Sequence, residues 1–353
     1  MEMLSSGVPV EAIDPESRDA GVAAHYGDPM REQRQLATDV GLVDRSHRGV
    51  LAVPGPERAS WLHNLTTQHL ADLRPGQGTE LLVLSPHGHI EHHALVAEDG
   101  DTIWLDTEPG TAADLLTFLE KMRFLTRVEP RDATAEWAVL SLVGPRAVGA
   151  LGLPLDEPQV APVPGPKFAA GSVPSTSTSG YAVRPLPWGG FARRGRLGVD
   201  LVVPRDAVDE VVATLGVPLA GLWAYEAIRV AARVPRVGWE TDHRTIPAEV
   251  DLLGPAVHLD KGCYRGQETV ARVHNMGRPP RRLVLLHLDG VTTDELPAPG
   301  TAVTTDDGRA VGFVGTAVRH FEWGQVALAV LKRNVPDDAA LRVGESAAAI
   351  DVP

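Results

Sequence analysis

The chain contains the stretch Lys261-Gly262-Cys263-Tyr264-Arg265-Gly266-Gln267-Glu268, which holds the protein's single cysteine. Glycines lie on both sides of the Cys-Tyr pair, and glycine permits backbone conformations and close approaches that other residues rarely allow. A lysine that lies near a thiol in space lowers the thiol pKa from its ordinary value of about 8.5. We therefore predict a functional site here, with Cys263 as its reactive or redox-sensitive group. Lys261 either assists the thiolate, meets an anionic ligand or is simply solvated.

The pattern K-G-C-Y-x-G-Q-E resembles the signature of the YgfZ family of folate-binding proteins, relatives of the glycine-cleavage T-protein, an aminomethyltransferase. Every defined position of that signature is present. The resemblance covers nearly the whole chain and includes Tyr26-Gly27-Asp28-Pro29, Gly41-Leu42-Val43-Asp44-Arg45-Ser46 and Leu84-Ser85-Pro86-His87-Gly88. The first twenty or so residues and the loop after Leu151 fall outside it.

The resemblance implies an α+β fold with three domains arranged as a clover-leaf, with folate held in the central hole. Two α+β domains are interleaved in sequence, and a small β-barrel follows them. We expect residues 1–50 and 136–225 to form the first domain and residues 51–135 and 226–280 the second. Residues 281–353 are expected to form the barrel.

Hydrophobic periodicity alone predicts an α+β body with a β-rich tail. Helices are expected at residues 32–43, 57–65, 111–126, 206–215 and 222–232, and strands at 49–53, 80–84, 89–97, 102–106, 136–143 and 198–203. Short strands with intervening turns follow from residue 282 onward, which is typical of a small barrel or sandwich. Residues 154–180 are dense in Pro, Ser, Thr and Gly and are interpreted as a solvated insertion.

Composition narrows the class of protein. A formal net charge of -13 disfavours a broad face for nucleic acid. One cysteine excludes an internal disulfide, and the N-terminal residues lack the pattern of a secretory signal. No window approaches the roughly 20 apolar residues of a membrane span. We therefore expect a cytoplasmic protein that does not enter the membrane.

The resemblance also implies folate-binding residues in other parts of the sequence. Asp200 lies where T-proteins carry the glutamate that accepts hydrogen bonds from the pterin ring. Arg229 aligns with the arginine near the folate tail, where a guanidinium suits carboxylates. Many relatives carry an aromatic residue seven positions before the carboxylate, and Arg193 stands there in this chain.

The other residues of the cysteine stretch have two open interpretations. Tyr264, Gln267 and Glu268 either line the wall of the folate site or hold the turn together by hydrogen bonds. Gly262 and Gly266 would let the backbone approach the ligand closely. We expect Cys263 to face the same cavity as Asp200 and Arg229.

Four histidines lie close together in the sequence: His87, His89, His92 and His93. The last two occupy the place of paired aspartates in T-proteins, the first of which is essential for aminomethyl transfer. Imidazole, with an ordinary pKa near 6.5, does not hold the permanent negative charge of an aspartate. T-protein catalysis is therefore disfavoured. Neighbours on a strand point to opposite faces, so His92 and His93 should diverge, and we predict no metal site.

Between residues 261 and 282, six basic residues are opposed only by Glu268: Lys261, Arg265, Arg272, Arg278, Arg281 and Arg282. Such a patch suits the polyglutamate tail of folate, an RNA backbone or an acidic partner surface, and arginines are also common in solvated linkers.

The function predicted first is a cytoplasmic, tetrahydrofolate-binding accessory protein that supports the assembly or repair of iron-sulfur enzymes. The iron-sulfur part follows from the resemblance alone, since a single cysteine cannot hold a cluster by four thiolates. One alternative is a folate-dependent aminomethyl transferase. Another is an accessory protein of tRNA modification that uses the basic residues to contact tRNA or a modifying enzyme.

Overall fold

A mixed sheet forms the body of the protein in a computed structural model that describes residues 11–155 and 180–352. Within those ranges it has 11 strands. In spatial order they are β13 (Leu219–Ala220), β3 (Gly41–Asp44), β9 (Trp137–Val143), β12 (Gly198–Pro204), β11 (Phe191–Arg194), β10 (Tyr181–Pro185), β5 (Gln77–Leu84), β6 (Ile90–Glu98), β7 (Thr102–Thr107), β4 (Gly49–Pro54) and β8 (Arg131–Asp132).

The sheet has two halves, one running in spatial order from β13 to β10 and the other from β5 to β8. Two strands distant in sequence join these halves. β10 pairs with β5 through Tyr181 opposite Gly78 and Ala182 opposite Gln77. Gly78 has no side chain, and a Cβ there would lie 2.5 Å from the Val96 carbonyl oxygen and 3.3 Å from the Arg193 side chain. The missing side chain therefore leaves room for an arginine to cross the seam between the halves.

Helices pack on both halves of the sheet and connect them to the rest of the chain. They are α1 (Pro29–Thr38), α2 (Arg58–Leu65), α3 (Ala112–Lys121), α4 (Ala147–Leu151), α5 (Val208–Leu215), α6 (Leu222–Ala231), α7 (Leu253–Ala256) and α8 (Gln267–Met276), with short 3₁₀ turns η1 (Arg205–Ala207) and η2 (Pro247–Glu249). A two-stranded ribbon, β1 (Glu11–Ala12) and β2 (Ala23–His25), precedes α1. Separate apolar clusters fill the two halves, one around Leu51 and Leu105 and the other around Leu140 and Leu201.

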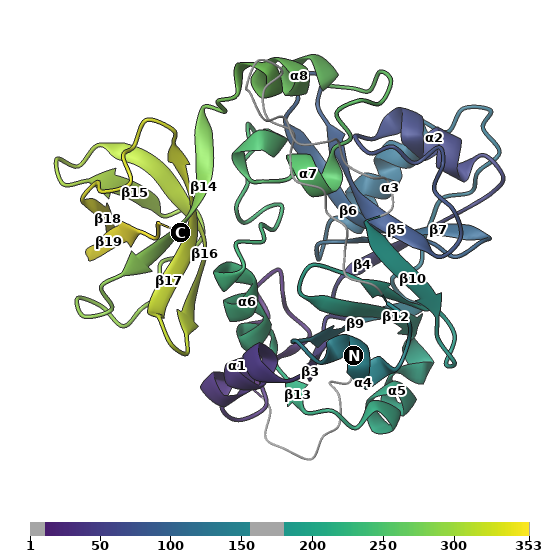
Figure 1. The fold of residues 1–353 in the computed structure, drawn as a ribbon, viewed down its shortest axis with the longest axis horizontal. Helices are drawn as coiled ribbons and strands as arrows, with labels where there is room; N and C mark the ends of the chain where they lie inside the picture. Colours follow the sequence, from purple (N-terminus) through teal and green to yellow (C-terminus); the bar gives the residue numbers. More distant parts are fainter. Residues whose placement is uncertain (1–10, 156–179, 353) are drawn as a thin grey trace.

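The C-terminal segment forms the predicted β-barrel, and the predicted α+β fold class is confirmed. The barrel is closed, with strands in the order β14 (Arg281–Leu288), β17 (Gly324–Lys332), β16 (Ala310–His320), β15 (Ala302–Thr305), β18 (Leu341–Val343) and β19 (Ser346–Ile350). Helix α6 lies between the barrel and the sheet (Figure 1). Ala227 and Val230 of α6 pack against Val318 and Leu328 of the barrel. One helix therefore connects the barrel to the sheet.

Two helix predictions were too long. The helix predicted to reach residue 43 ends at Thr38, because Gly41–Asp44 is fully buried as a strand that pairs with β9 and β13. The helix predicted to reach residue 126 ends at Lys121, and Phe124 just beyond it has a φ of 45°, which is incompatible with a continuing helix. Residues 156–179 of the predicted insertion lie outside the described ranges.

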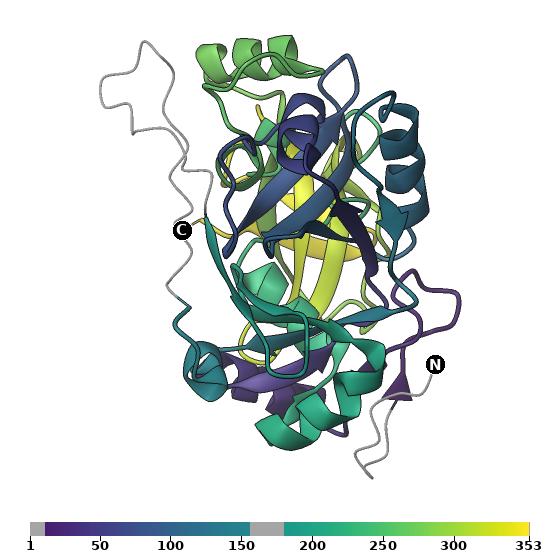
Figure 2. The ribbon, with the colours of Figure 1, turned by 90° about the vertical axis from the view of Figure 1, so that its right-hand side faces the viewer.

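The opposite ends of the molecule carry different parts of the sequence. Helix α8, which follows the cysteine, lies at one end of the body, and α5 lies at the other (Figure 2).

In the described part of the chain, no helix combines the length and the apolar character that crossing a bilayer requires. The proposed boundaries between three domains stay a prediction.

Candidate functional site

A small cavity lies where the two halves of the sheet meet α6, and we call it the central cavity. Its volume is about 70 Å³, which is room for a few water molecules. Most of its polar side chains are charged, and they come from β5, β6, β9 to β12, α6 and four connecting segments. They are Arg45, Arg48, Glu80, His93, Glu108, Ser141, Tyr181, Arg193, Arg196, Asp200, Tyr225, Arg229 and Arg236.

Asp200 is held on the cavity wall by three partners. Arg193 and Ser141 lie directly opposite it on the neighbouring strands β11 and β9. Arg193 Nη2 donates to Asp200 Oδ2 at 2.9 Å, and Ser141 Oγ donates to Oδ1 at 2.6 Å. Arg45 Nη1 lies 3.4 Å from the same Oδ1. Burial opposes ionisation of this carboxyl, but the two arginines and the serine outweigh it and lower its pKa.

The arginine at the expected aromatic position is the centre of a larger network. Arg193 Nη1 lies 2.5 Å from Asp106 Oδ1, and Arg48 Nε donates to the other oxygen of Asp106 at 2.9 Å. Arg48 Nη1 and Arg236 Nε each donate to Glu108 at 2.8 Å. We call these linked side chains, together with Asp200 and Arg45, the central ion-pair network. Where the resemblance places an aromatic residue, this chain has Arg193, which forms ion pairs with Asp106 and Asp200.

Arg229 lines the cavity but does not offer its guanidinium to a ligand in this structure. Its Nε donates to Glu226 at 3.0 Å, and its Nη1 donates to the Val234 carbonyl oxygen at 2.6 Å and to Glu240 at 3.3 Å. Its Nη2 donates to Glu226 at 2.7 Å and to Thr316 Oγ1 at 2.6 Å. All three nitrogens are therefore occupied, and because Thr316 belongs to β16, the arginine ties α6 to the barrel.

A second carboxylate, Glu80, is completely surrounded by donors at the seam of the sheet. Arg196 donates to both of its oxygens at 2.9 Å, Tyr181 donates to Oε1, and His93 Nε2 lies 2.9 Å from Oε2. Burial opposes ionisation of Glu80, but Arg196, His93 and Tyr181 together lower its pKa. The imidazole of His93, which the resemblance aligns with a T-protein aspartate, is thus bound to a glutamate inside the cavity.

The histidines diverge as the strand geometry predicts. His93 lines the cavity, whereas the His92 ring lies 6.2 Å from that of Phe118 on α3. Burial lowers the pKa of His92. The His87 and His89 rings lie 6.1 Å apart. Among residues 11–155 and 180–352, no three His, Cys, Asp or Glu side chains form a group that could hold a metal ion.

The ammonium group of Lys261 donates hydrogen bonds to backbone carbonyl oxygens and not to the Cys263 thiol. Its ammonium donates to the carbonyl oxygens of His63, Thr66 at 2.6 Å and Gln68 at 3.0 Å. These oxygens lie at the end of α2 and just after it, where backbone acceptors lack helical partners. Burial lowers the pKa of Lys261 to about 8. The lysine therefore connects the cysteine stretch to α2.

The remaining residues of the cysteine stretch do not reach the central cavity. Cys263 is exposed, and none of residues 261–268 lines the cavity. The prediction that Cys263 faces the same cavity as Asp200 is therefore wrong: the stretch packs against α2 and the β5–β6 turn instead. Tyr264 is buried beside Val250 and Leu252. Gln267 donates to the Lys261 carbonyl oxygen at 3.3 Å, and Glu268 is exposed.

Gly266 allows the cysteine stretch to pack against the β5–β6 turn. Its φ is 82°, and a Cβ there would lie 2.7 Å from the Ser85 carbonyl oxygen and 2.9 Å from Gly88 Cα. Gly262 has no atom within 4 Å of its virtual Cβ. Both glycines were predicted to let a ligand approach closely. Gly266 instead lets the chain's own backbone approach.

The predicted basic patch is largely neutralised by acidic neighbours. Arg265 lies 3.1 Å from Glu91, Arg281 contacts Asp242 at 2.7 Å and Glu249 at 2.8 Å, and Arg282 contacts Asp337 at 2.5 Å. Lys261 is buried, whereas Arg272 and Arg278 are exposed. These six residues therefore do not form one open cationic surface.

Sequence reasoning missed most of the central ion-pair network and the separate Arg196–Glu80 pair. Glu80 and Asp106 lie within strands that are otherwise apolar or neutral, and a buried charge in such a strand requires a partner. That signal was available in the sequence. It does not say which arginine is the partner, because Arg196 and Arg193 come from a hairpin more than eighty residues further along the chain.

Comparison with known proteins identifies relatives. Residues 24–182 match the family described as the GCVT N-terminal domain. A chloroplastic protein of Arabidopsis thaliana named as a transferase is 28% identical over 285 residues, which cover 77% of this chain and 60% of that protein. The chain therefore spans less than two thirds of that relative. The aminomethyltransferase of Chlorobium chlorochromatii is 26% identical over 298 residues, covering 82% of this chain and 78% of the relative.

A solved structure has the same fold. The glycine cleavage system aminomethyltransferase T from Bartonella henselae superposes with a TM-score of 0.71 and 18% sequence identity. The match covers 96% of this chain and 92% of that one. This likeness shows the fold, and the predicted T-protein-like architecture is confirmed.

Substituting Gly266 tests the close packing of the cysteine stretch. We expect Gly266→Ala to lower the free energy of unfolding by about 2 kcal/mol or more, because alanine is strained at positive φ and its Cβ would clash with Ser85 and Gly88. Gly262→Ala is the matched control and should change it by less than about 0.5 kcal/mol. Both values come from urea denaturation, and equal effects of the two substitutions would contradict this packing.

The acid stability of the chain tests the charge state of Glu80. The folded chain keeps this carboxyl ionised, whereas the unfolded chain takes up a proton near the ordinary pKa of 4.5, so Glu80 contributes stability that is lost as pH falls below that value. In Glu80→Gln, the dependence of unfolding free energy on pH between about 3 and 4 should be shallower by up to about 1.4 kcal/mol per pH unit. Urea denaturation at a series of pH values measures it. Glu120→Gln, at an exposed position on α3, should keep the wild-type slope. An unchanged slope in Glu80→Gln would show that folding does not lower the pKa of Glu80.

Proposed function

We propose that this chain binds a reduced folate in the central cavity and acts as an accessory protein rather than as an aminomethyltransferase. The T-protein fold and the aminomethyltransferase relatives support a folate ligand. The observation that carries the proposal is the position of Asp200: its carboxylate lies on the wall of the cavity at the junction of sheet and helix α6.

The chemistry of the cavity fits the polar edge of a pterin. An ionised carboxylate accepts hydrogen bonds from the amino group and the ring nitrogen of a pterin, and the pKa of Asp200 is lowered. Tyr225 lines the same cavity, with the Arg45 guanidinium 4.3 Å from its ring centre, which offers a flat surface for stacking. Tyr225 and Arg45 would hold the ring, and Asp200 would orient it.

The space in this conformation is smaller than a pterin. A volume of about 70 Å³ admits water but not a bicyclic ring. Arg193 occupies Asp200 Oδ2, so we propose that ligand binding separates this cross-strand pair. Arg193 retains Asp106 as a partner when it leaves Asp200, so its charge is not left alone.

Aminomethyl transfer is not part of the proposal. His93 lies in the cavity at the position of a T-protein aspartate, and its Nε2 is held by Glu80. The resemblance places the essential aspartate at His92, whose ring lies beside that of Phe118, and neither imidazole supplies a permanent carboxylate.

The iron-sulfur role and the membership in the YgfZ family are proposed on the cysteine stretch. Cys263 is exposed at the surface of the chain, which suits contact with a client protein better than contact with a ligand inside the cavity. We place this activity in the reducing cytoplasm, where a lone thiol stays free. The pairing of the basic residues gives no support to direct tRNA binding.

Calorimetric titration with tetrahydrofolate tests the site. Asp200→Asn should weaken binding at least about tenfold, since the charged acceptor is lost. Arg193→Tyr should tighten binding, because it frees Asp200 and restores an aromatic residue. Glu91→Gln, which removes a surface ion pair of the cysteine stretch, should leave the affinity unchanged. Equal affinity in wild type and Asp200→Asn, or no binding by wild type or Arg193→Tyr, would defeat the proposal.

The absence of turnover is tested separately. We expect wild type to form no methylenetetrahydrofolate from an aminomethyl donor, whereas an aminomethyltransferase assayed in parallel does so. Clear turnover by wild type that is lost in Asp200→Asn would establish the enzymatic alternative in place of the accessory role.

A further inference from the structure

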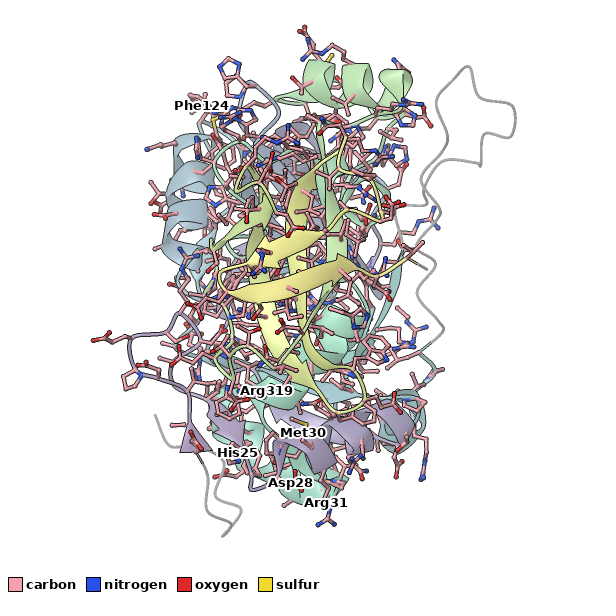
Figure 3. The ribbon with its side chains drawn as sticks, turned by 90° about the vertical axis from the view of Figure 1, so that its left-hand side faces the viewer. His25, Asp28, Met30, Arg31, Phe124 and Arg319 are labelled. Carbon is pink, nitrogen blue, oxygen red and sulfur yellow. The ribbon has the colours of Figure 1, made fainter. Side chains whose placement is uncertain are left out.

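A second, larger pocket lies away from the central cavity, between helix α1, helix α6 and the barrel. Its volume is about 450 Å³, which is within the size range of small-molecule sites. Its walls are mainly apolar and include Met30, Leu222, Trp223, Trp239 and Val318. We call it the tryptophan pocket. Met30 and Arg319, which both line it, lie close together where α1 passes the lower edge of the barrel (Figure 3).

The frame of this pocket is fixed by contacts between elements. Gln33 of α1 donates to the Arg319 carbonyl oxygen at 2.9 Å and accepts from the Phe321 backbone N–H at 2.9 Å. Glu32 of the same helix accepts from the Gly221 N–H at 2.8 Å, just before α6. These bonds hold the helices and the barrel at a set spacing, so the pocket is largely preformed.

One wall of the pocket is an exposed indole. Trp223 on α6 is 45% exposed, which is unusual for a large aromatic side chain in a protein with a well-packed core. The His25 ring lies 5.3 Å from it, in a tilted arrangement. Trp239, in contrast, is covered by the Arg236 guanidinium 3.7 Å from its ring centre. Trp223 is therefore the aromatic surface on which a ligand could stack.

The charges at the pocket favour a cation. Its lining includes the carboxylates of Asp14, Asp19 and Glu226 and a single basic side chain, Arg319. Arg319 is already paired with Asp294 at 2.5 Å. Asp19 and Glu226 are neutralised by Arg236, whereas the Asp14 carboxylate is exposed at the rim and, among the described residues, accepts a hydrogen bond only from the Glu16 N–H.

We propose that the tryptophan pocket binds a small organic amine, a flat aromatic body that carries a protonated amino group. The apolar body would stack on Trp223, and the ammonium group would face Asp14 and the indole, since cations are attracted both to carboxylates and to aromatic faces. This site is separate from the proposed folate site, because Glu226 of α6 lines the tryptophan pocket whereas Tyr225 and Arg229 line the central cavity.

Calorimetric titration with 2-(2-naphthyl)ethylamine tests the proposal on the full-length chain. A ligand of this size should bind with a dissociation constant of about 0.1–1 mM. Its counterpart with the opposite charge, 3-(2-naphthyl)propionate, should bind at least about fivefold more weakly. No detectable binding of the amine, or equal binding of the carboxylate, would overturn the proposal.

Variants place the binding in this pocket. Trp223→Ala and the pocket-filling Met30→Trp should each weaken amine binding at least about fivefold, and Trp223→Phe should retain most of it. Phe124→Ala, at an 80% exposed residue at the opposite end of the molecule, is the control and should bind like wild type (Figure 3). Thermal unfolding confirms that each variant is folded. Unchanged affinity in both Trp223→Ala and Met30→Trp would show that the amine binds elsewhere.

Discussion

The structure depends on buried arginine–carboxylate pairs at the junction of the sheet halves, α6 and the barrel. Arg193 connects Asp200 of the first half to Asp106 of the second, and Arg229 connects α6 to Thr316 of the barrel. Taking such charges out of water is costly, and removal of one partner from a buried pair typically costs about 3–5 kcal/mol. The pairs therefore favour one arrangement of the two sheet halves and the barrel. An arrangement that separates the partners leaves a buried charge alone.

This constraint also shapes the central cavity. Every carboxylate on its wall already has an arginine partner, so a ligand that needs a carboxylate must compete with an arginine for it. The Arg193–Asp200 pair is the suitable point of competition, because Asp106 keeps Arg193 neutralised when Asp200 is released. The same α6 helix separates this polar cavity from the apolar tryptophan pocket, so one element could position two sites of opposite character.

The cysteine stretch shows that residue types can indicate a kind of contact without indicating its partner. The glycine pattern does reflect a close backbone approach at Gly266, but the neighbour is the β5–β6 turn and not a ligand. The lysine does have polar partners, but they are carbonyl oxygens at the end of α2 and not a thiolate. Residue type predicts the kind of interaction, whereas the partner depends on which distant segment packs there.

The sequence alone determined the elements whose patterns are local: the barrel strands, the β5–β6 hairpin and the divergence of His92 from His93, because side-chain periodicity follows from backbone geometry. It also identified Asp200 and Arg229 as residues of one cavity, through the resemblance. Only the tertiary structure decided that Ser141, Asp200 and Arg193 form one row and that Cys263 lies outside it. Strand register brings together residues that are far apart in the chain, and a shift of one position would turn each side chain to the opposite face.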